Sequence, residues 1–191
     1  MKELFPSFAD PKAWRCNRRD YTTKETWRRI RQKILARDDY ACQYCGFRAM
    51  HWQIVHHIDG NPNNNSLHNL EVLCPMCNLV MHAGQGCIIQ EVVDLYRQSK
   101  FAQGRVNAIT RKMRSEGKAD AAIIAFLGLR ANVPFRMDKR YLKSLFGFVS
   151  SRKPAQEWAR NALEYGYHKC KSEMRQLGRE NRRLSEFMCM E

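Results

Sequence analysis

Two kinds of metal-ligating side chain gather in the middle of this chain. Four cysteines form two Cys-x-x-Cys pairs, Cys42/Cys45 in CQYC and Cys74/Cys77 in CPMC. Thiolates paired at this spacing are the ligands that a tetrahedral structural zinc ion prefers, and four of them fill its coordination sphere. The spacing therefore predicts a four-cysteine zinc site that contributes to folding and leaves no open position for chemistry.

Chemistry would then depend on a second set of side chains. His56 and His57 are adjacent in IVHHIDG, and Asn78 and His82 are four residues apart in a segment with helical spacing. Residues four apart share a face of a helix, whereas neighbours in a strand point to opposite faces. We therefore expect His56, Asn78 and His82 to bind one divalent cation, with His57 held off it and free to take a proton from water. The alternative is that the two histidines are ordinary polar residues at a strand end.

The elements that position these residues can be predicted from periodicity. Residues 22–40, TTKETWRRIRQKILARDDY, have apolar side chains at helical spacing and indicate a basic amphipathic helix. Residues 52–58 indicate a strand, and residues 59–69 an Asn-rich loop. Residues 70–84 indicate a second strand that passes through CPMC into a helix. Strand, loop, strand and helix in this order form a ββα unit.

Composition favours a polyanionic partner. The 191 residues carry a formal net charge of +14, distributed as +5 over residues 1–41, −3 over 42–95 and +12 over 96–191. An excess of positive charge indicates that the partner is nucleic acid or, as a second choice, an acidic membrane surface. The alternative is that the basic residues lie on solvent-exposed faces of a soluble protein and bind no such partner. No apolar run approaches the roughly 18 residues of a membrane helix, and the N-terminus does not resemble a signal peptide. We expect a cytoplasmic protein that does not enter membranes.

The stretches CQYC, VHHIDG, HNLEVLCPMCN and the following histidine resemble the HNH (His-Asn-His) nuclease family, including its members with a four-cysteine zinc. The resemblance covers roughly residues 22–86. It implies an α+β, mostly helical protein with a ββα-metal core and flanking helices. It also implies an endonuclease that hydrolyses the phosphodiester bonds of double-stranded DNA with a divalent metal.

The same resemblance assigns roles to individual residues. It makes His57 the general base, His56 the first metal ligand, and Asn69 the middle residue that braces the loop and orients the base. Asn78 and His82 match positions where family members place further ligands. Two imidazoles favour manganese, nickel, cobalt or zinc, while the activity of the family with magnesium keeps that ion open.

A second resemblance leads to a different class of function. YACQYCGFRA, QIVHHIDGN and NNNSLHNL also resemble the IcmJ/DotN component of type IVB secretion coupling complexes, an HNH-like zinc protein thought to act as a scaffold. This resemblance implies a non-catalytic role in a protein complex. A third alternative is a zinc module that binds DNA or RNA without cutting it.

We divide the chain into an N-terminal arm (1–21), the nuclease-like domain (22–95), a basic helical lobe (96–153) and a C-terminal helix (154–191). Within the lobe, a helix, a short turn and a second helix are predicted in an order similar to the opening of a helix-turn-helix motif. The following helix is predicted farther along the chain than that motif normally allows. The C-terminal helix carries a heptad pattern that would suit a homodimer, with packing on the chain's own core as the alternative. The predicted nucleic-acid contacts are Arg28, Arg29, Arg48, Arg111, Lys112, Arg114, Lys139, Arg140 and Lys143.

Overall fold

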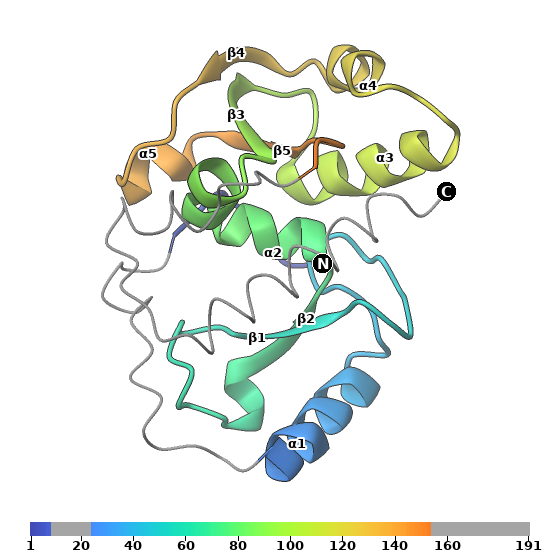
Figure 1. The fold of residues 1–191 in the computed structure, drawn as a ribbon, viewed down its shortest axis with the longest axis vertical. Helices are drawn as coiled ribbons and strands as arrows, with labels where there is room; N and C mark the ends of the chain where they lie inside the picture. Colours follow the sequence, from blue (N-terminus) through green and yellow to red (C-terminus); the bar gives the residue numbers. More distant parts are fainter. Residues whose placement is uncertain (9–23, 154–191) are drawn as a thin grey trace.

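The computed structural model describes residues 1–8 and 24–153, which contain both helices and strands (Figure 1). The elements in chain order are α1 (Lys24–Arg37), β1 (Ile54–His57), the 3-10 helix η1 (Leu67–Asn69), β2 (Leu70–Leu73), α2 (Pro75–Met81), the π-helix η2 (Gln85–Ile89), β3 (Val93–Gln98), α3 (Gln103–Ser115), α4 (Asp120–Leu127), β4 (Arg130–Val133), α5 (Lys139–Lys143) and β5 (Phe146–Val149). The fold is mixed α+β. Helices account for fewer than half of the described residues, so "mostly helical" is wrong.

Strands β1 and β2 form an antiparallel pair with helices on both faces. Val55, Leu70 and Val72 pack with Ile34 and Leu35 of α1 in one apolar cluster. The opposite face of β2 contributes Leu73 to a second cluster, which contains α2 and the four cysteines. The predicted strand, loop, strand and helix are thus present in the expected order, and α1 ends next to Asp38 and Asp39 as predicted.

The part of the chain after η2 forms what we term the sheet lobe, residues 93–153. Its core is a three-stranded antiparallel sheet in the order β4-β3-β5, with α3 and α4 alongside (Figure 1). The prediction of a helical lobe therefore needs correction. Residues 146–149 form strand β5, which pairs with β3 and buries Phe148 and Val149.

The sheet also bears on the predicted resemblance to a helix-turn-helix motif. α3 and α4 are separated by a short turn, as that motif requires, and α4 ends at Gly128 with the left-handed backbone typical of a helix C-cap. The chain then enters strand β4, which pairs with β3, so a strand and not a further helix follows α4. The boundary proposed between residues 95 and 96 falls inside β3.

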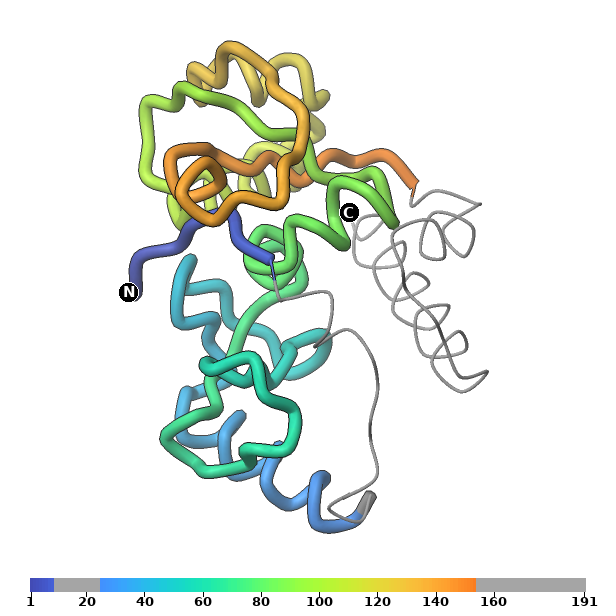
Figure 2. Tube along the Cα trace, turned by 90° about the vertical axis from the view of Figure 1, so that its left-hand side faces the viewer, coloured from blue at the N-terminus to red at the C-terminus, as the bar shows by residue number. Residues whose placement is uncertain are grey.

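Residues 1–8 connect the turn that carries Cys42 and Cys45 to the C-terminal end of α2. The backbone N–H of Lys2 donates to Gln43, and Ser7 exchanges backbone hydrogen bonds with Val80 and Ala83. Figure 2 shows this dark-blue segment between the part of the chain that carries β1 and β2 and the sheet lobe. The heptad pattern of residues 154–191 and most of the predicted arm lie outside the described residues.

No helix within residues 1–8 and 24–153 combines the length and the apolar character that crossing a bilayer requires. The expectation of a cytoplasmic protein stays a prediction.

Hydrogen bonds of Arg114 and Asp120 connect α3 and α4 to the end of β5. The Arg114 guanidinium donates to Asp120 Oδ1 at 2.7 Å and to the Val149 carbonyl at 2.7 Å, while Ser151 donates its N–H to Asp120 Oδ2 at 2.6 Å. Burial would raise the pKa of Asp120, but the hydrogen bonds from Ser151 and Arg114 outweigh it and lower the pKa below its ordinary value. The charged carboxylate therefore stabilises the folded state.

We predict that Asp120→Asn lowers the free energy of unfolding at pH 7 by about 1–2 kcal/mol, because charge-assisted hydrogen bonds are lost at a partly solvated site. A depressed folded-state pKa contributes stability above the unfolded pKa and loses it as the pH falls. The difference from wild type should hence shrink below about pH 4. Urea unfolding at several pH values checks this, with the exposed Glu116→Gln as control. A constant difference down to pH 3 would contradict the assignment.

Candidate metal centres

The four predicted cysteines meet in the interior. Their sulfur atoms all lie within 4.8 Å of one another, and the Sγ atoms of Cys45 and Cys74 are 3.6 Å apart. Sulfurs on a tetrahedral zinc ion with bonds of about 2.3 Å are about 3.8 Å apart, whereas a disulfide bond is about 2.0 Å long. The arrangement thus fits a four-coordinate structural metal such as zinc, and all four side chains are buried.

Each cysteine pair is held by a local turn. In the first, Cys42 N–H donates to the Phe47 carbonyl and Gly46 N–H to the Cys42 carbonyl, with Gly46 in the left-handed conformation at φ 74°. In the second, Cys74 is the N-cap of α2, and its sulfur accepts the Cys77 N–H at 3.5 Å, followed by Pro75 at the first helical position. The second turn therefore directs a backbone N–H at a cysteine sulfur, while the first is closed by hydrogen bonds between backbone groups.

The pKa values of the cysteines are shifted in opposite directions. Hydrogen bonds from the other three thiols, first that of Cys42, hold the pKa of Cys45 far below its usual range, and the charge of Arg111 acts in the same direction. Burial raises the pKa of Cys74, and the hydrogen bonds with Cys42 and the other thiols raise the pKa of Cys77. A metal ion needs deprotonated sulfur, so metal binding would release protons from these thiols.

The histidine set is brought together only in part. The rings of His56 and His82 lie with their centroids 5.2 Å apart, and Asn78 lies one helical turn before His82, which caps α2. Two imidazoles bound to one tetrahedral ion through nitrogens about 2.1 Å away would have ring centroids about 5 Å apart. The two histidines consequently have the spacing of a shared ligand pair. Burial, and next the charge of His56, lower the pKa of His82 to about 4, so it is neutral at pH 7, as a ligand must be.

Glu71 lies beside this pair and was not predicted. It faces His56 across the β1–β2 register, with its Oε1 3.7 Å from His56 Nδ1, and that nitrogen has no hydrogen-bond partner among the described residues. Burial would raise the pKa of Glu71, but contacts with His56, Lys2 and Tyr44 lower it to about 2. A carboxylate behind a histidine is the usual outer partner of a metal-binding imidazole. The one signal in the sequence was a charge inside the apolar run NLEVLC.

His57 lies on the other face of β1, as strand alternation predicts. Its ring stacks on Trp27 of α1 with centroids 5.7 Å apart, and its Nε2 is 3.0 Å from Asn65 Oδ1. An amide oxygen can only accept, so Nε2 donates this hydrogen bond, and Nδ1 of the neutral ring keeps a lone pair. Asn65 and Trp27 are thus further site residues that the sequence interpretation did not assign.

Asn69 braces the loop that follows His57. Its Oδ1 accepts the Asp59 N–H at 3.0 Å, and its Nδ2 donates to Asp59 Oδ1 and to the Asn64 carbonyl, both at 2.9 Å. Asn69 therefore holds Asp59 and Asn64 together, while its predicted part in catalysis stays a prediction. The side chain that hydrogen-bonds to His57 is Asn65.

Two of the nine predicted nucleic-acid contacts are directed into the fold, and three others form ion pairs on the surface. Arg111 is directed at the cysteine sulfurs and Arg114 at Asp120, so these two guanidiniums act inside the fold. Arg29 pairs with Glu25, Arg48 with Asp39, and Lys112 lies 3.9 Å from Glu116. The exposed remainder lies on separate elements: Arg28 on α1, and Lys139, Arg140 and Lys143 on α5.

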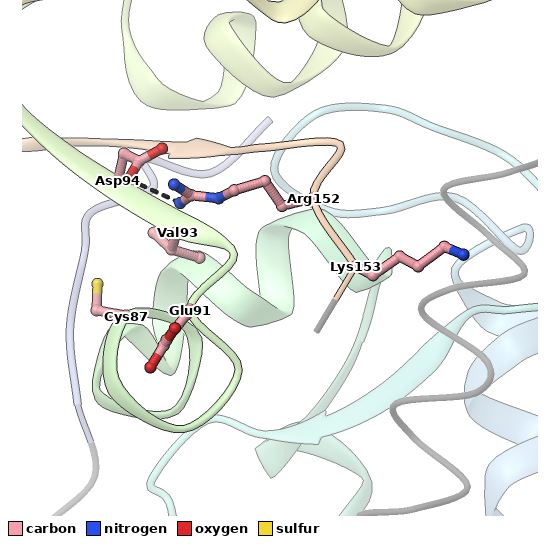
Figure 3. Close-up of a pocket in the computed structure, with 6 residues that line it drawn as sticks. All are labelled: Cys87, Glu91, Val93, Asp94, Arg152 and Lys153. Carbon is pink, nitrogen blue, oxygen red and sulfur yellow. Dashed lines mark hydrogen bonds and ion pairs between the residues drawn. The ribbon is translucent and has the colours of Figure 1, made fainter. Parts of the chain in front are cut away.

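A small cavity of about 310 Å³ lies elsewhere, at the junction of η2 and β3 with the end of the described chain (Figure 3). It is lined by Cys87, Glu91, Val93, Asp94, Arg152 and Lys153. Arg152 spans it through an ion pair with Asp94 at 2.8 Å, and burial raises the pKa of the Cys87 thiol to about 12. The cavity shares no residue with either candidate metal centre.

The structure is thus a mixed α+β protein with a cluster of four cysteines that could bind a structural metal such as zinc. Comparison with known protein families finds none that matches this chain. Among curated proteins, the chain is similar to the Type 4 apparatus protein DotN of Legionella pneumophila, with 27% identity over 199 aligned positions. The match covers 82% of this chain and 89% of that protein.

We predict that the purified protein holds one zinc ion per chain and that Cys74→Ser releases it and lowers the melting temperature, because the sulfur lies at the N-cap of α2 and in the core. Cys87→Ser, a cysteine outside the cluster, should keep the zinc and most of the stability. Elemental analysis and thermal unfolding measure both effects. A Cys74→Ser protein with full zinc content and unchanged melting would refute the centre.

Proposed function

We propose that this protein is a component of a type 4 secretion apparatus or a similar transport complex, in which a zinc-organised fold serves as a scaffold for protein partners. The observation that supports this most directly is the extent of the similarity to DotN. A shared nuclease-like domain alone would account for residues 22–95, whereas the match covers 82% of this chain. It therefore extends beyond the ββα unit.

The exposed surface around α5 has the composition of a protein interface. The guanidiniums of Arg97 and Arg136 lie 6.0 and 5.2 Å from the ring centroid of Tyr141, and Met137 is 56% exposed next to them. Arginine, tyrosine and methionine are the residues enriched at such interfaces. In a scaffold, this surface would contact an acidic partner protein.

A scaffold also has a structural use for the histidines. His57 packs on Trp27 and binds Asn65, and Asn69 closes the loop, so these residues hold α1 and the loop to β1 whether or not a reaction occurs. Retention of the nuclease-like residues is consequently compatible with a protein that does not cut nucleic acid.

The second candidate function is the metal-dependent hydrolysis of DNA, and the ligand-like spacing of His56 and His82 favours it. His57 Nδ1, left as an acceptor by the bond to Asn65, could take the proton from an attacking water. Glu71 would hold the His56 ring, and Asn69 would hold the loop over the site. A divalent cation bound by His56, Asn78 and His82 would supply positive charge to stabilise the charge that develops on the phosphate oxygens.

The scaffold role predicts that the tagged protein, recovered from its own cells after mild crosslinking, carries subunits of a type 4 apparatus in fixed proportion. Charge reversal of the α5 surface, Arg97→Glu with Arg136→Glu, should reduce this association at least tenfold without changing zinc content. Quantitative mass spectrometry measures it, with Arg28→Glu on α1 as the matched control. Recovery of the wild-type protein without any such subunit would count against the scaffold.

The hydrolase role predicts that wild-type protein nicks supercoiled plasmid in the presence of manganese, nickel, zinc or magnesium, and that His57→Ala reduces the rate by at least 100-fold, the usual contribution of general base catalysis. Agarose gels measure the nicked fraction, and His51→Ala, an exposed histidine outside both centres, is the control. Absence of cleavage with every metal leaves the scaffold as the function, while cleavage lost in His57→Ala establishes the hydrolase.

A further inference from the structure

Helix α3 of the sheet lobe sends two side chains to the cysteine sulfurs. Arg111 Nη2 donates to Cys74 Sγ at 3.1 Å, and its Nη1 lies 3.7 Å from Cys45 Sγ. One turn earlier, the fully buried Asn107 donates its Nδ2 to Cys77 Sγ at 3.2 Å. Three of the four cysteines thus accept a hydrogen bond from a helix about 30 residues or more away along the chain.

Both donors are held in orientation by other groups. The Arg111 guanidinium stacks on Phe47 of the first cysteine turn, 3.7 Å from the ring centroid. Asn107 Oδ1 accepts from Gln103 Nε2 at 3.1 Å, and Gln103 exchanges hydrogen bonds of 2.7 and 2.6 Å with the Gly147 backbone on β5. Because Gln103 occupies Oδ1, the amide nitrogen of Asn107 is the group directed at sulfur. A buried polar chain therefore runs from β5 to Cys77.

The backbone of α3 also approaches the first cysteine turn closely. A Cβ at Gly104 would lie 2.4 Å from the carbonyl oxygen of Tyr44, a distance that real side chains do not adopt. Glycine at this position lets the helix lie directly against the turn that carries Cys42 and Cys45. The absence of a side chain at Gly104 therefore permits the close contact between α3 and the first cysteine turn.

Charge explains why the donors are needed. Four thiolates around a divalent ion carry a net charge of −2, and a buried charge without partners is costly. Arg111 offsets one of these charges, and N–H groups that donate to a charged acceptor make hydrogen bonds roughly twice as strong as neutral ones.

We propose that α3 forms the outer shell of the four-cysteine centre, with Arg111 and Asn107 as positioning residues, and that metal binding at the cysteines docks the sheet lobe onto the ββα unit. The inference rests on a metal at the cysteines and not on the proposed scaffold role. A failure of either can thus be recognised separately.

The test compares zinc retention in wild type, Arg111→Lys and Asn107→Asp. Arg111→Lys keeps the charge but removes the planar fork and the stack on Phe47, and Asn107→Asp is isosteric but places a carboxylate against Cys77. Loss of outer-shell partners typically weakens metal binding by 10–100-fold. We expect zinc transfer to a coloured chelator to become about 10–100-fold faster in both. Lys112→Ala, the exposed neighbour on the same helix, should behave as wild type.

Two further measurements separate this role from simple packing. Hydrogen exchange of the backbone amides in α3 should become faster when zinc is removed from the wild-type protein. Amides in the apolar cluster that α1 forms with β1 and β2 should change less. The sulfur-to-metal charge-transfer bands of the cobalt-substituted protein should shift in Asn107→Asp, because the hydrogen bond to Cys77 changes. Wild-type zinc release and cobalt spectra in both variants, even with reduced thermal stability, would reduce Arg111 and Asn107 to packing residues and overturn the proposal.

Discussion

Four buried cysteine sulfurs within 4.8 Å of one another impose the constraint on which the rest of the structure depends. Two of these cysteines lie in a turn after α1, and the other two lie at the start of α2. The chain between the two pairs must therefore reverse its direction, which it does through the antiparallel strands β1 and β2. A small ββα unit buries little apolar surface, and a metal that binds both ends can contribute much of its folding free energy. The core cluster that contains the cysteines also includes Leu142, Leu145 and Val149 of the sheet lobe.

The second centre follows from the alternation of strand β1. His56 is directed to His82 and Glu71, and His57 to Trp27 and Asn65, because adjacent residues in a strand face opposite sides. One face of the strand therefore carries a ligand-like pair backed by a carboxylate, while the other carries an oriented imidazole. This geometry suits a hydrolase, and it equally serves to hold a loop and a helix on the sheet.

The choice between these functions depends on features outside the ββα unit. The similarity to DotN extends over most of both chains, and the basic side chains expected to hold DNA are divided among internal contacts, surface ion pairs and separate elements. A cutter of duplex DNA needs cations that follow the phosphate backbone on one face. The arginine, tyrosine and methionine surface near α5 has instead the composition of a protein interface.

The sequence by itself determined the local features of this protein. Spacing identified the four cysteines, periodicity identified α1, and β-branched and turn-forming residues identified β1, the loop and β2, since these signals depend on neighbours in the chain. Only the tertiary structure decided which distant groups meet. Glu71 behind His56, Asn107 and Arg111 at the sulfurs, and the pairing of Phe146–Val149 with β3 depend on contacts between segments far apart in the chain. An arginine that donates to a buried thiolate and one that faces solvent look alike in a sequence, because the difference lies in what the fold places beside them.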